Sequence, residues 1–163
     1  MTRLWDKGLP LDQRVLRYTA GEDHKLDARL VPYDVRGSIA HAEMLAACGL
    51  ITGEDCTDIC IGLAELEKAY ADGDWQISIE DEDVHTALET RLTAKIGDAG
   101  GRLHLGRSRN DQVLTALRLY LRDTADDLGK RVQELVLTLR DLAPVSYTHL
   151  RAHETYLLIS YAV

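Results

Sequence analysis

The stretch GRLHLGRSRNDQ, residues 101–112, joins a glycine-rich loop to the start of a long periodic helix. Glycine allows the backbone to approach a ligand closely, and a helix start offers unpaired N–H groups with a partial positive charge. Arg107 and Arg109 add planar forks that fit carboxylates, and Asn110 can both donate and accept hydrogen bonds. These groups favour a site for a small polyanion, best a dicarboxylate. The alternative is a polar loop in which Ser108 or Asn110 only caps the helix.

Beyond this stretch, apolar side chains recur at steps of mainly three and four residues, which predicts one continuous helix over 108–143. The apolar positions are Val113, Leu117, Tyr120, Leu121, Leu128, Val132, Leu135, Val136, Leu139 and Leu142. Such a helix would be about 50 Å long, too long for a domain of this size to cover. The stripe therefore predicts partner helices in a bundle; the alternative is a solvated single helix with an unused stripe.

The rest of the chain is also predicted to be helical, because Phe is absent, Pro is rare and the apolar spacing has the helical period. Helices are expected at about 12–18, 32–47, 52–73 and 81–96. Thr52 and Asp55 form a variant capping box, and either Asp81 or Asp83 caps the last of these helices. The glycine-rich residues 97–106 are expected to be a loop.

Composition excludes several classes of function. The 163 residues carry a formal net charge of -8 and contain no Lys/Arg-rich run, so neither nucleic acid nor an anionic membrane is expected as a partner. No apolar run is long enough to span a bilayer, and the first residues lack a signal-peptide pattern. Three cysteines, Cys48, Cys56 and Cys60, favour free thiols in a reducing cytoplasm. A metal pair at Cys56 and Cys60 is the alternative to buried structural thiols.

Three segments carry a resemblance to a known family. Residues 104–112 match H-x-G-R-S-R-N-D-Q, the first signature region of the argininosuccinate lyases, a branch of the fumarase/aspartase superfamily. Residues 26–42 resemble the family's D-x-x-L-x-x-x-D-x-x-G-S-x-A-H stretch, and residues 80–89 resemble its D-E-D-[IV]-H-x-A-x-E helix start. The segments occur in the family's order and spacing, and the resemblance covers roughly residues 1–143.

The resemblance implies an all-α fold, namely the superfamily's N-terminal helical domain followed by the start of a long helix of the central bundle. We expect the helical domain at 1–106, the truncated bundle helix at 107–143 and an atypical tail at 144–163. The family's active sites are assembled from three subunits of a homotetramer, and its catalytic serine lies on a loop beyond this chain. The chain is therefore expected to be an N-terminal fragment that is inactive alone.

The tail departs from the family. Residues 147–150 read YTHL, part of the family's second signature Y-T-H-L-Q, but about two helical turns too early. We interpret 145–163 as foreign, because its first residues resemble translated sequencing-adapter sequence. Alternatively it is a shortened genuine signature, which would place His149 beside the chemistry. A metal held by His149 and His153 is a further alternative.

The reaction implied by the resemblance is a β-elimination that splits argininosuccinate into arginine and fumarate without a cofactor. The positions that match the family's substrate-binding motif are Arg107, Ser108, Arg109 and Asn110. Asp23 stands where the family has a substrate-binding serine, and an aspartate cannot donate to a carboxylate at neutral pH. His85 matches a helix-start histidine near the site, with a cap or core role as the alternative, and His41 is expected to be structural.

Two other functions are compatible with the same residues. Another lyase of the superfamily is one, although the adenylosuccinate and aspartate branches would change the R-S-R-N-D cluster. A non-catalytic structural relative, as when lyases serve as lens crystallins, is the other.

Overall fold

The computed structural model describes residues 14–15, 18 and 21–160, without the side chains of Asp23 and of 145–160. The helix predicted at 12–18 therefore lies largely outside the described residues. Internal contacts divide the chain into two compact units, Met1–Tyr120 and Leu121–Val163, and each is described by itself.

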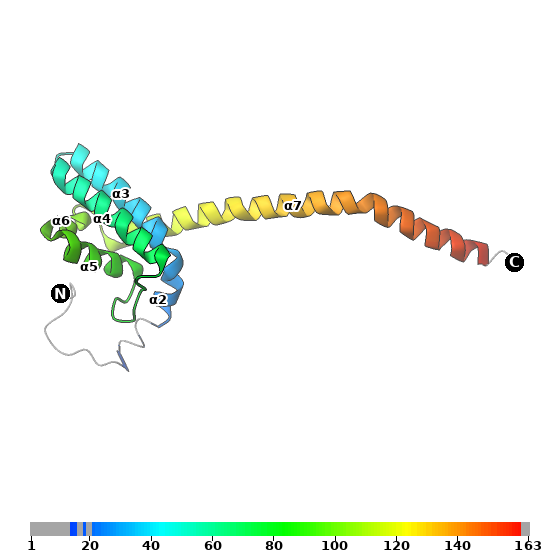
Figure 1. The fold of residues 1–163 in the computed structure, drawn as a ribbon, viewed down its shortest axis with the longest axis horizontal. Coiled ribbons are helices and arrows are strands. Elements are labelled where there is room, and N and C mark those ends of the chain that lie inside the picture. The colour runs from blue at the N-terminus through cyan, green and yellow to red at the C-terminus, as the bar shows by residue number, and fades with distance from the viewer. Residues whose placement is uncertain (1–13, 16–17, 19–20, 161–163) are drawn as a thin grey trace. The chain divides into compact units, whose positions relative to one another are not determined.

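The described residues form helices and no strand, which confirms the all-α prediction (Figure 1). Chain order is α2 (Asp23–Leu26), the 3-10 helix η1 (Asp27–Arg29), α3 (Val31–Ala47), α4 (Gly53–Asp72), α5 (Val84–Ile96), α6 (Asp98–Gly101), the 3-10 helix η2 (Arg102–His104) and α7 (Arg109–Ser160).

Helix α4 begins and ends where its sequence signals predict. The Thr52 hydroxyl accepts a hydrogen bond from the Asp55 N–H at 3.0 Å, and the Asp55 carboxylate accepts one from the Thr52 N–H at 3.3 Å. This reciprocal pair is a capping box. At the other end Gly73 has φ 87°, a left-handed conformation that favours glycine and stops the helix.

The core lies where α3, α4 and α5 pack together, with α3 and α4 side by side in Figure 1. Its largest apolar side chains are fully buried: Leu45, Ile59, Leu63, Leu88 and Leu92. The prediction of a loop at 97–106 is partly wrong, because α6 and η2 form there. Gly100 allows α6 to approach α5, since a Cβ at this position would lie 2.8 Å from the Thr93 backbone.

Helix α7 begins at Arg109, one residue after the predicted start, and continues through Pro144 to Ser160, so the predicted end at 143 is wrong. In the second unit, the apolar stripe is exposed over its described side chains: Leu121, Leu128, Val132, Leu135, Val136, Leu139 and Leu142. Stripes of this kind are stable in water only when another surface covers them. The expected division of the chain at 106 and 143 stays a prediction.

Candidate functional site

The four residues of the motif at 107–110 lead into α7, and they differ in whether their polar groups are already hydrogen-bonded within the protein. Ser108 is a helix cap, because its hydroxyl accepts a hydrogen bond from the Asp111 N–H at 3.4 Å. Its hydroxyl and its N–H in turn donate to Asp111 Oδ2 at 2.9 and 3.0 Å. These two hydrogen bonds hold the pKa of Asp111 below its ordinary value. Asn110 is exposed. Of these two polar residues, Asn110 is therefore the one that faces solvent without a capping role.

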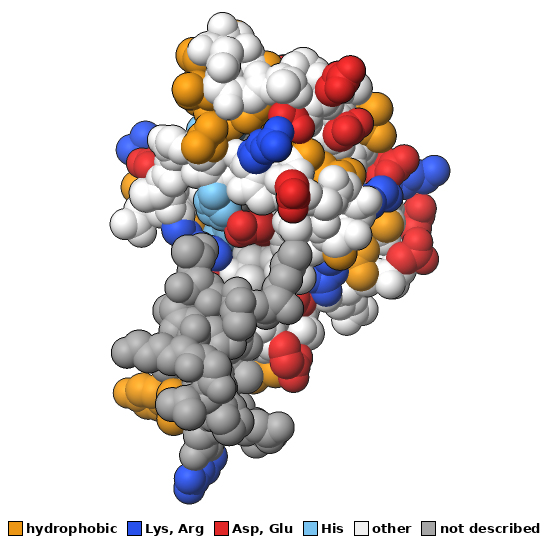
Figure 2. Space-filling view, turned by 90° about the vertical axis from the view of Figure 1, so that its left-hand side faces the viewer, with side chains coloured by type: hydrophobic (Ala, Val, Ile, Leu, Met, Phe, Trp, Pro, Cys, Tyr) orange, Lys and Arg blue, Asp and Glu red, His pale blue; other side chains and the backbone are white. Residues whose placement is uncertain are grey.

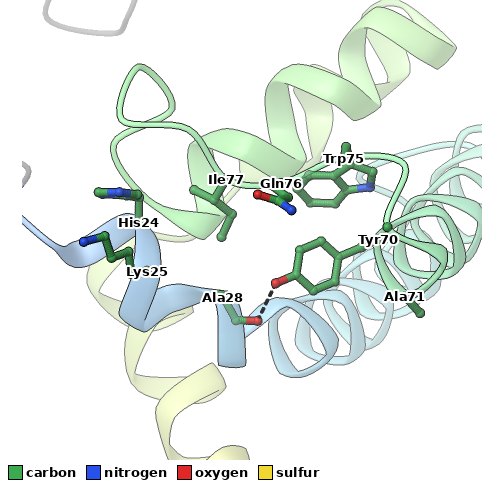
Figure 3. Close-up of a pocket in the computed structure, with 9 residues that line it drawn as sticks. His24, Lys25, Ala28, Tyr70, Ala71, Trp75, Gln76 and Ile77 are labelled. Carbon is green, nitrogen blue, oxygen red and sulfur yellow. Dashed lines mark hydrogen bonds between the residues drawn. The ribbon is translucent and has the colours of Figure 1, made fainter.

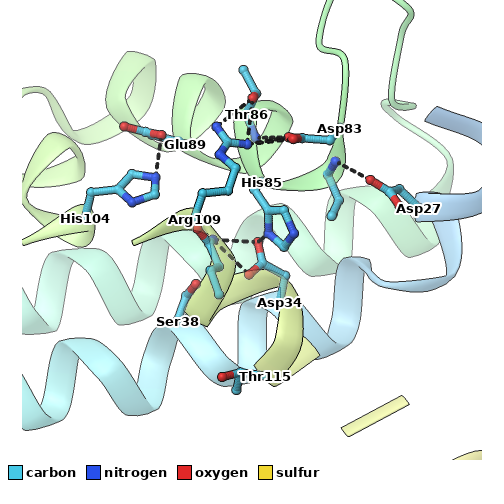
Figure 4. A network of polar contacts seen from close by, with 12 residues as sticks. Asp27, Asp34, Ser38, Asp83, His85, Thr86, Glu89, His104, Arg109 and Thr115 are labelled. Carbon is cyan, nitrogen blue, oxygen red and sulfur yellow. Dashed lines mark hydrogen bonds and ion pairs between the residues drawn. The ribbon is translucent and has the colours of Figure 1, made fainter. Parts of the chain in front are cut away.

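Arg109 clasps the start of α5 (Figure 4). Its Nη1 lies 2.7 Å from both carboxylate oxygens of Asp83, and both of its terminal nitrogens donate to the Thr86 hydroxyl at 3.0 Å. Asp83 also caps α5 by accepting a hydrogen bond from the Thr86 N–H at 2.8 Å. The structure therefore selects Asp83 over Asp81 as the cap, and Arg109 is already paired with a carboxylate.

The ion pair between Arg109 and Asp83, called the Asp83 clasp here, makes the free energy of unfolding depend on pH. Burial raises the pKa of Asp83, but the Thr86 N–H and the Arg109 charge lower it more, so the folded pKa lies below the ordinary value. A lowered folded pKa stabilises the fold above the unfolded value of about 3.9, and this contribution disappears as pH falls through the folded pKa. We expect the difference in unfolding free energy between wild type and Asp83→Asn to be largest above about pH 4 and to shrink in acid. Urea unfolding at several pH values measures it.

The matched control for this prediction is Asp58→Asn, an exposed position on α4. It should leave the pH dependence of stability unchanged. A constant gap between wild type and Asp83→Asn from pH 6 down to acid would contradict the expected titration.

Arg107 keeps unused donors. Its Nη2 donates to the Ser38 hydroxyl at 3.2 Å, while its Nε is buried with no partner among the described residues. Burial lowers the pKa of the guanidinium, and the nearby carboxylates of Asp34, Glu89 and Asp111 act in the opposite direction. The Arg107 side chain stays charged despite its partial burial, because the pKa of an arginine in a protein remains far above neutral pH. Arg107 is thus a partly buried cation with capacity to bind an anion.

His85 is only 2% exposed and lies against Asp34, which is 1% exposed. The His85 Nδ1 is 3.1 Å from Asp34 Oδ2, and Gln112 Nε2 donates to both Asp34 oxygens at 2.9 and 3.1 Å. Sequence reasoning did not propose Asp34, Gln112 or Ser38 as site residues. One signal was available: Asp34 and Ser38 are polar positions on the buried face of α3.

The remaining predicted residues lie beside this cluster or outside the described part of the chain. His41 Nε2 contacts the Leu105 carbonyl at 2.9 Å, and burial lowers the pKa of the ring; the structural role expected for His41 stays a prediction. The side chains of Asp23 and His149 lie outside the described residues. Cys56 and Cys60 are partly buried free thiols, and burial together with Cys56 raises the pKa of Cys60 to about 11.

A separate pocket of about 560 Å³ lies between α2, the end of α4 and the link that follows it (Figure 3). Lys25, Tyr70 and Trp75 are among its lining residues. Of the predicted substrate-binding residues whose side chains the structure describes, none lines it. The Tyr70 hydroxyl and the Trp75 Nε1 already donate to backbone carbonyls, and Arg91 stacks on the Trp75 ring. The polar groups of these aromatic residues therefore serve the fold.

In Figure 2 acidic and basic side chains are interspersed with apolar ones on the face shown. Among the described residues, no three His, Cys, Asp or Glu side chains form a group suited to a metal ion. None of the helices in that part of the chain combines the length and apolar character needed to cross a bilayer.

Comparison with known proteins gives the family. A family model described as Lyase matches residues 12–153. The chain belongs to this lyase family. The match extends past residue 143, so the foreign origin proposed for 145–163 stays a prediction.

Relatives within the lyase family are close in sequence. The chain is 47% identical to an argininosuccinate lyase of Synechococcus sp. over 148 residues, which cover 86% of this chain and 30% of that protein. It is 44% identical to the argininosuccinate lyases of Thermotoga neapolitana and Sorangium cellulosum, over 85% and 91% of this chain and 34% and 36% of those proteins. The chain thus spans about a third of the length of these relatives.

Proposed function

We propose that this chain is the N-terminal part of an argininosuccinate lyase, which eliminates fumarate from argininosuccinate and releases arginine. The observation that carries the proposal is 44–47% identity to proteins of that name over most of the chain. The polar cluster supports it, because Arg107 and Asn110 offer donors to an anion at a helix start. An argininosuccinate lyase acts in arginine biosynthesis, and we place the protein in the cytoplasm.

The reaction needs donors that act on developing negative charge. A base removes the proton beside a carboxylate, electrons spread into that carboxylate, and an acid protonates the departing guanidino nitrogen. Fixed donors stabilise the resulting dianion best when they are preorganised. We assign Asn110 and Arg107 to this task. Ser108 and Arg109 shape the same helix start, and Arg109 can reach the substrate only by leaving Asp83.

The chain supplies one wall of the proposed site. We propose a homotetramer for the full-length protein, whose other subunits complete the site, and no cofactor. Asp23 and His85 are further candidates for substrate contacts. The 163-residue chain alone is expected to have no turnover.

A turnover assay on the full-length protein tests the proposed function. We expect it to form fumarate from argininosuccinate and to leave adenylosuccinate and aspartate unchanged, since the R-S-R-N-D cluster is specific to one branch of the superfamily. The ultraviolet absorbance of fumarate follows the reaction, and the 163-residue chain serves as the inactive control. A full-length protein that is folded and assembled but inactive would identify a non-catalytic relative and refute the assignment.

A further inference from the structure

Ser38 is a polar residue in the core of the first unit. It lies on the face of α3 that also carries Val31, Val35 and Leu45, and its exposure is 1%. An alanine would fill nearly the same space, favour the helix more and bring no polar group that must be buried. The packing of α3 therefore does not account for the hydroxyl group.

The hydroxyl of Ser38 binds Arg107, which lies 69 residues later in the chain. Arg107 Nη2 donates to Ser38 Oγ at 3.2 Å, and this is the one hydrogen bond that the guanidinium makes to the described residues. Arg107 stands in the short loop between η2 and α7. The contact therefore fastens the first residue of the motif at 107–110 to α3.

The three nitrogens of the Arg107 guanidinium differ in their surroundings. Nη2 is bound to the buried Ser38, and Nε is buried without a partner among the described residues. Nη1 has no hydrogen-bond partner in that part of the chain either, but it is not buried. The guanidinium thus turns Nη2 and Nε toward the protein and keeps Nη1 as a donor that a ligand can reach.

Arg107 also differs from the other half-buried arginines of the described chain in the kind of partner it has. Arg91 forms an ion pair with Asp81 at 3.1 Å. Arg109 forms one with Asp83 at 2.7 Å. Arg107 forms no ion pair with a described residue, because its one partner is a neutral hydroxyl. A neutral partner orients a cation without neutralising it, so Arg107 keeps its full attraction for an anion.

We propose that Ser38 is a positioning residue, which holds the guanidinium of Arg107 in place before α7 so that Nη1 can donate to a carboxylate of the substrate. This inference rests on the proposed lyase function, since argininosuccinate supplies the carboxylates. Without the hydroxyl, no hydrogen bond to a described residue keeps the guanidinium half-buried, and hydration favours its release into water. A released side chain meets the substrate in many orientations instead of one, which weakens binding and catalysis.

Ser38→Ala should separate activity from stability in the full-length protein. A hydrogen bond to a charged group shifts an equilibrium by about 10- to 100-fold, and we expect kcat/KM to fall by about tenfold or more. The Tm should stay unchanged or rise, because alanine favours the helix and the released Arg107 leaves no unpaired charge in the interior. A serine that serves only the fold predicts the reverse, so a variant that unfolds or has a lower Tm would overturn the proposal.

A double variant tests whether Ser38 acts through Arg107. Ser38→Ala/Arg107→Met should have the same kcat/KM as Arg107→Met, since the hydroxyl has no guanidinium left to hold. A further loss in the double variant would show that Ser38 acts by another route. Ser78→Ala is the matched control, because it also removes a serine hydroxyl that binds a side chain, in this case Asp81. It should keep kcat/KM unchanged.

Nitrogen NMR of the arginine-labelled 163-residue chain tests the contact without any activity. We expect the Nε–H of Arg107, assigned by its loss in Arg107→Met, to exchange with water at least about tenfold more slowly than that of the exposed Arg29. In Ser38→Ala it should exchange as fast as the Nε–H of Arg29. Equal exchange rates for Arg107 in the wild type and in Ser38→Ala would overturn the proposal.

The two kinds of measurement separate this inference from the proposed function. If the full-length wild type shows no turnover, the proposed function fails, while the exchange rates still decide whether Ser38 holds Arg107. If turnover is normal and Ser38→Ala leaves kcat/KM unchanged, only the positioning role fails.

Discussion

Replacing Asn110 with alanine in the full-length protein should lower kcat about 100- to 1,000-fold, the usual cost of losing one donor to a developing oxyanion. Asn110 lies in the first turn of α7 and is exposed, so its loss removes no packing. The stability of the variant should therefore equal that of the wild type. Steady-state kinetics and thermal unfolding of the same preparations measure the two effects.

Thr57→Ala provides the control for Asn110→Ala. Thr57 is an exposed polar residue on α4 whose hydroxyl donates to the Gly53 carbonyl, remote in sequence from the motif. It should keep full activity. Near-normal kcat for Asn110→Ala would remove Asn110 from the site, and unfolding of that variant would show that its role is structural.

The 163-residue chain should associate through the stripe on α7, and Leu128→Glu/Leu135→Glu should turn it into a monomer. The two leucines are 60% and 57% exposed and lie seven residues apart on one helix face. Burying two leucine side chains contributes roughly 3–6 kcal/mol, so their loss should weaken association by about 100-fold or more. Sedimentation velocity over a range of concentrations measures the change.

Gln133→Glu/Thr138→Glu introduces the same charge at exposed polar positions of α7 and should leave the association intact. A wild-type chain that sediments as a compact monomer, with the amides of α7 protected from hydrogen exchange, would contradict the bundle interpretation.

Local signals were enough to place most of the helices. Thr52 with Asp55, and Gly73, marked the two ends of α4 because caps act over three or four residues. The choice between Asp81 and Asp83 was not decidable from sequence, since both precede an apolar run. Asp83 is the cap, since its carboxylate accepts from the Thr86 N–H, and it also pairs with Arg109, 26 residues later, whereas Asp81 accepts from Arg91.

The buried polar contacts of the first unit could not be predicted from the sequence either, because they also join residues that lie far apart in the chain. Asp34 and Gln112 meet across 78 residues, and no local pattern reports a contact of that range. The sequence showed which side chains at 107–110 could bind an anion, but it could not show which of them already bind other side chains of the protein. Ser108 proved to be bound to Asp111 and Arg109 to Asp83, whereas Asn110 remained exposed.

The clasp between Arg109 and Asp83 has a thermodynamic consequence for any ligand that seeks Arg109. Because the guanidinium already has a carboxylate partner, an incoming anion replaces that partner and does not fill a vacancy. Replacement frees Asp83 from the cation that helps to lower its pKa, so its affinity for a proton rises. Anion binding at Arg109 would thus be linked to proton uptake by Asp83 in acid, and by reciprocity acid would favour the ligand over the clasp.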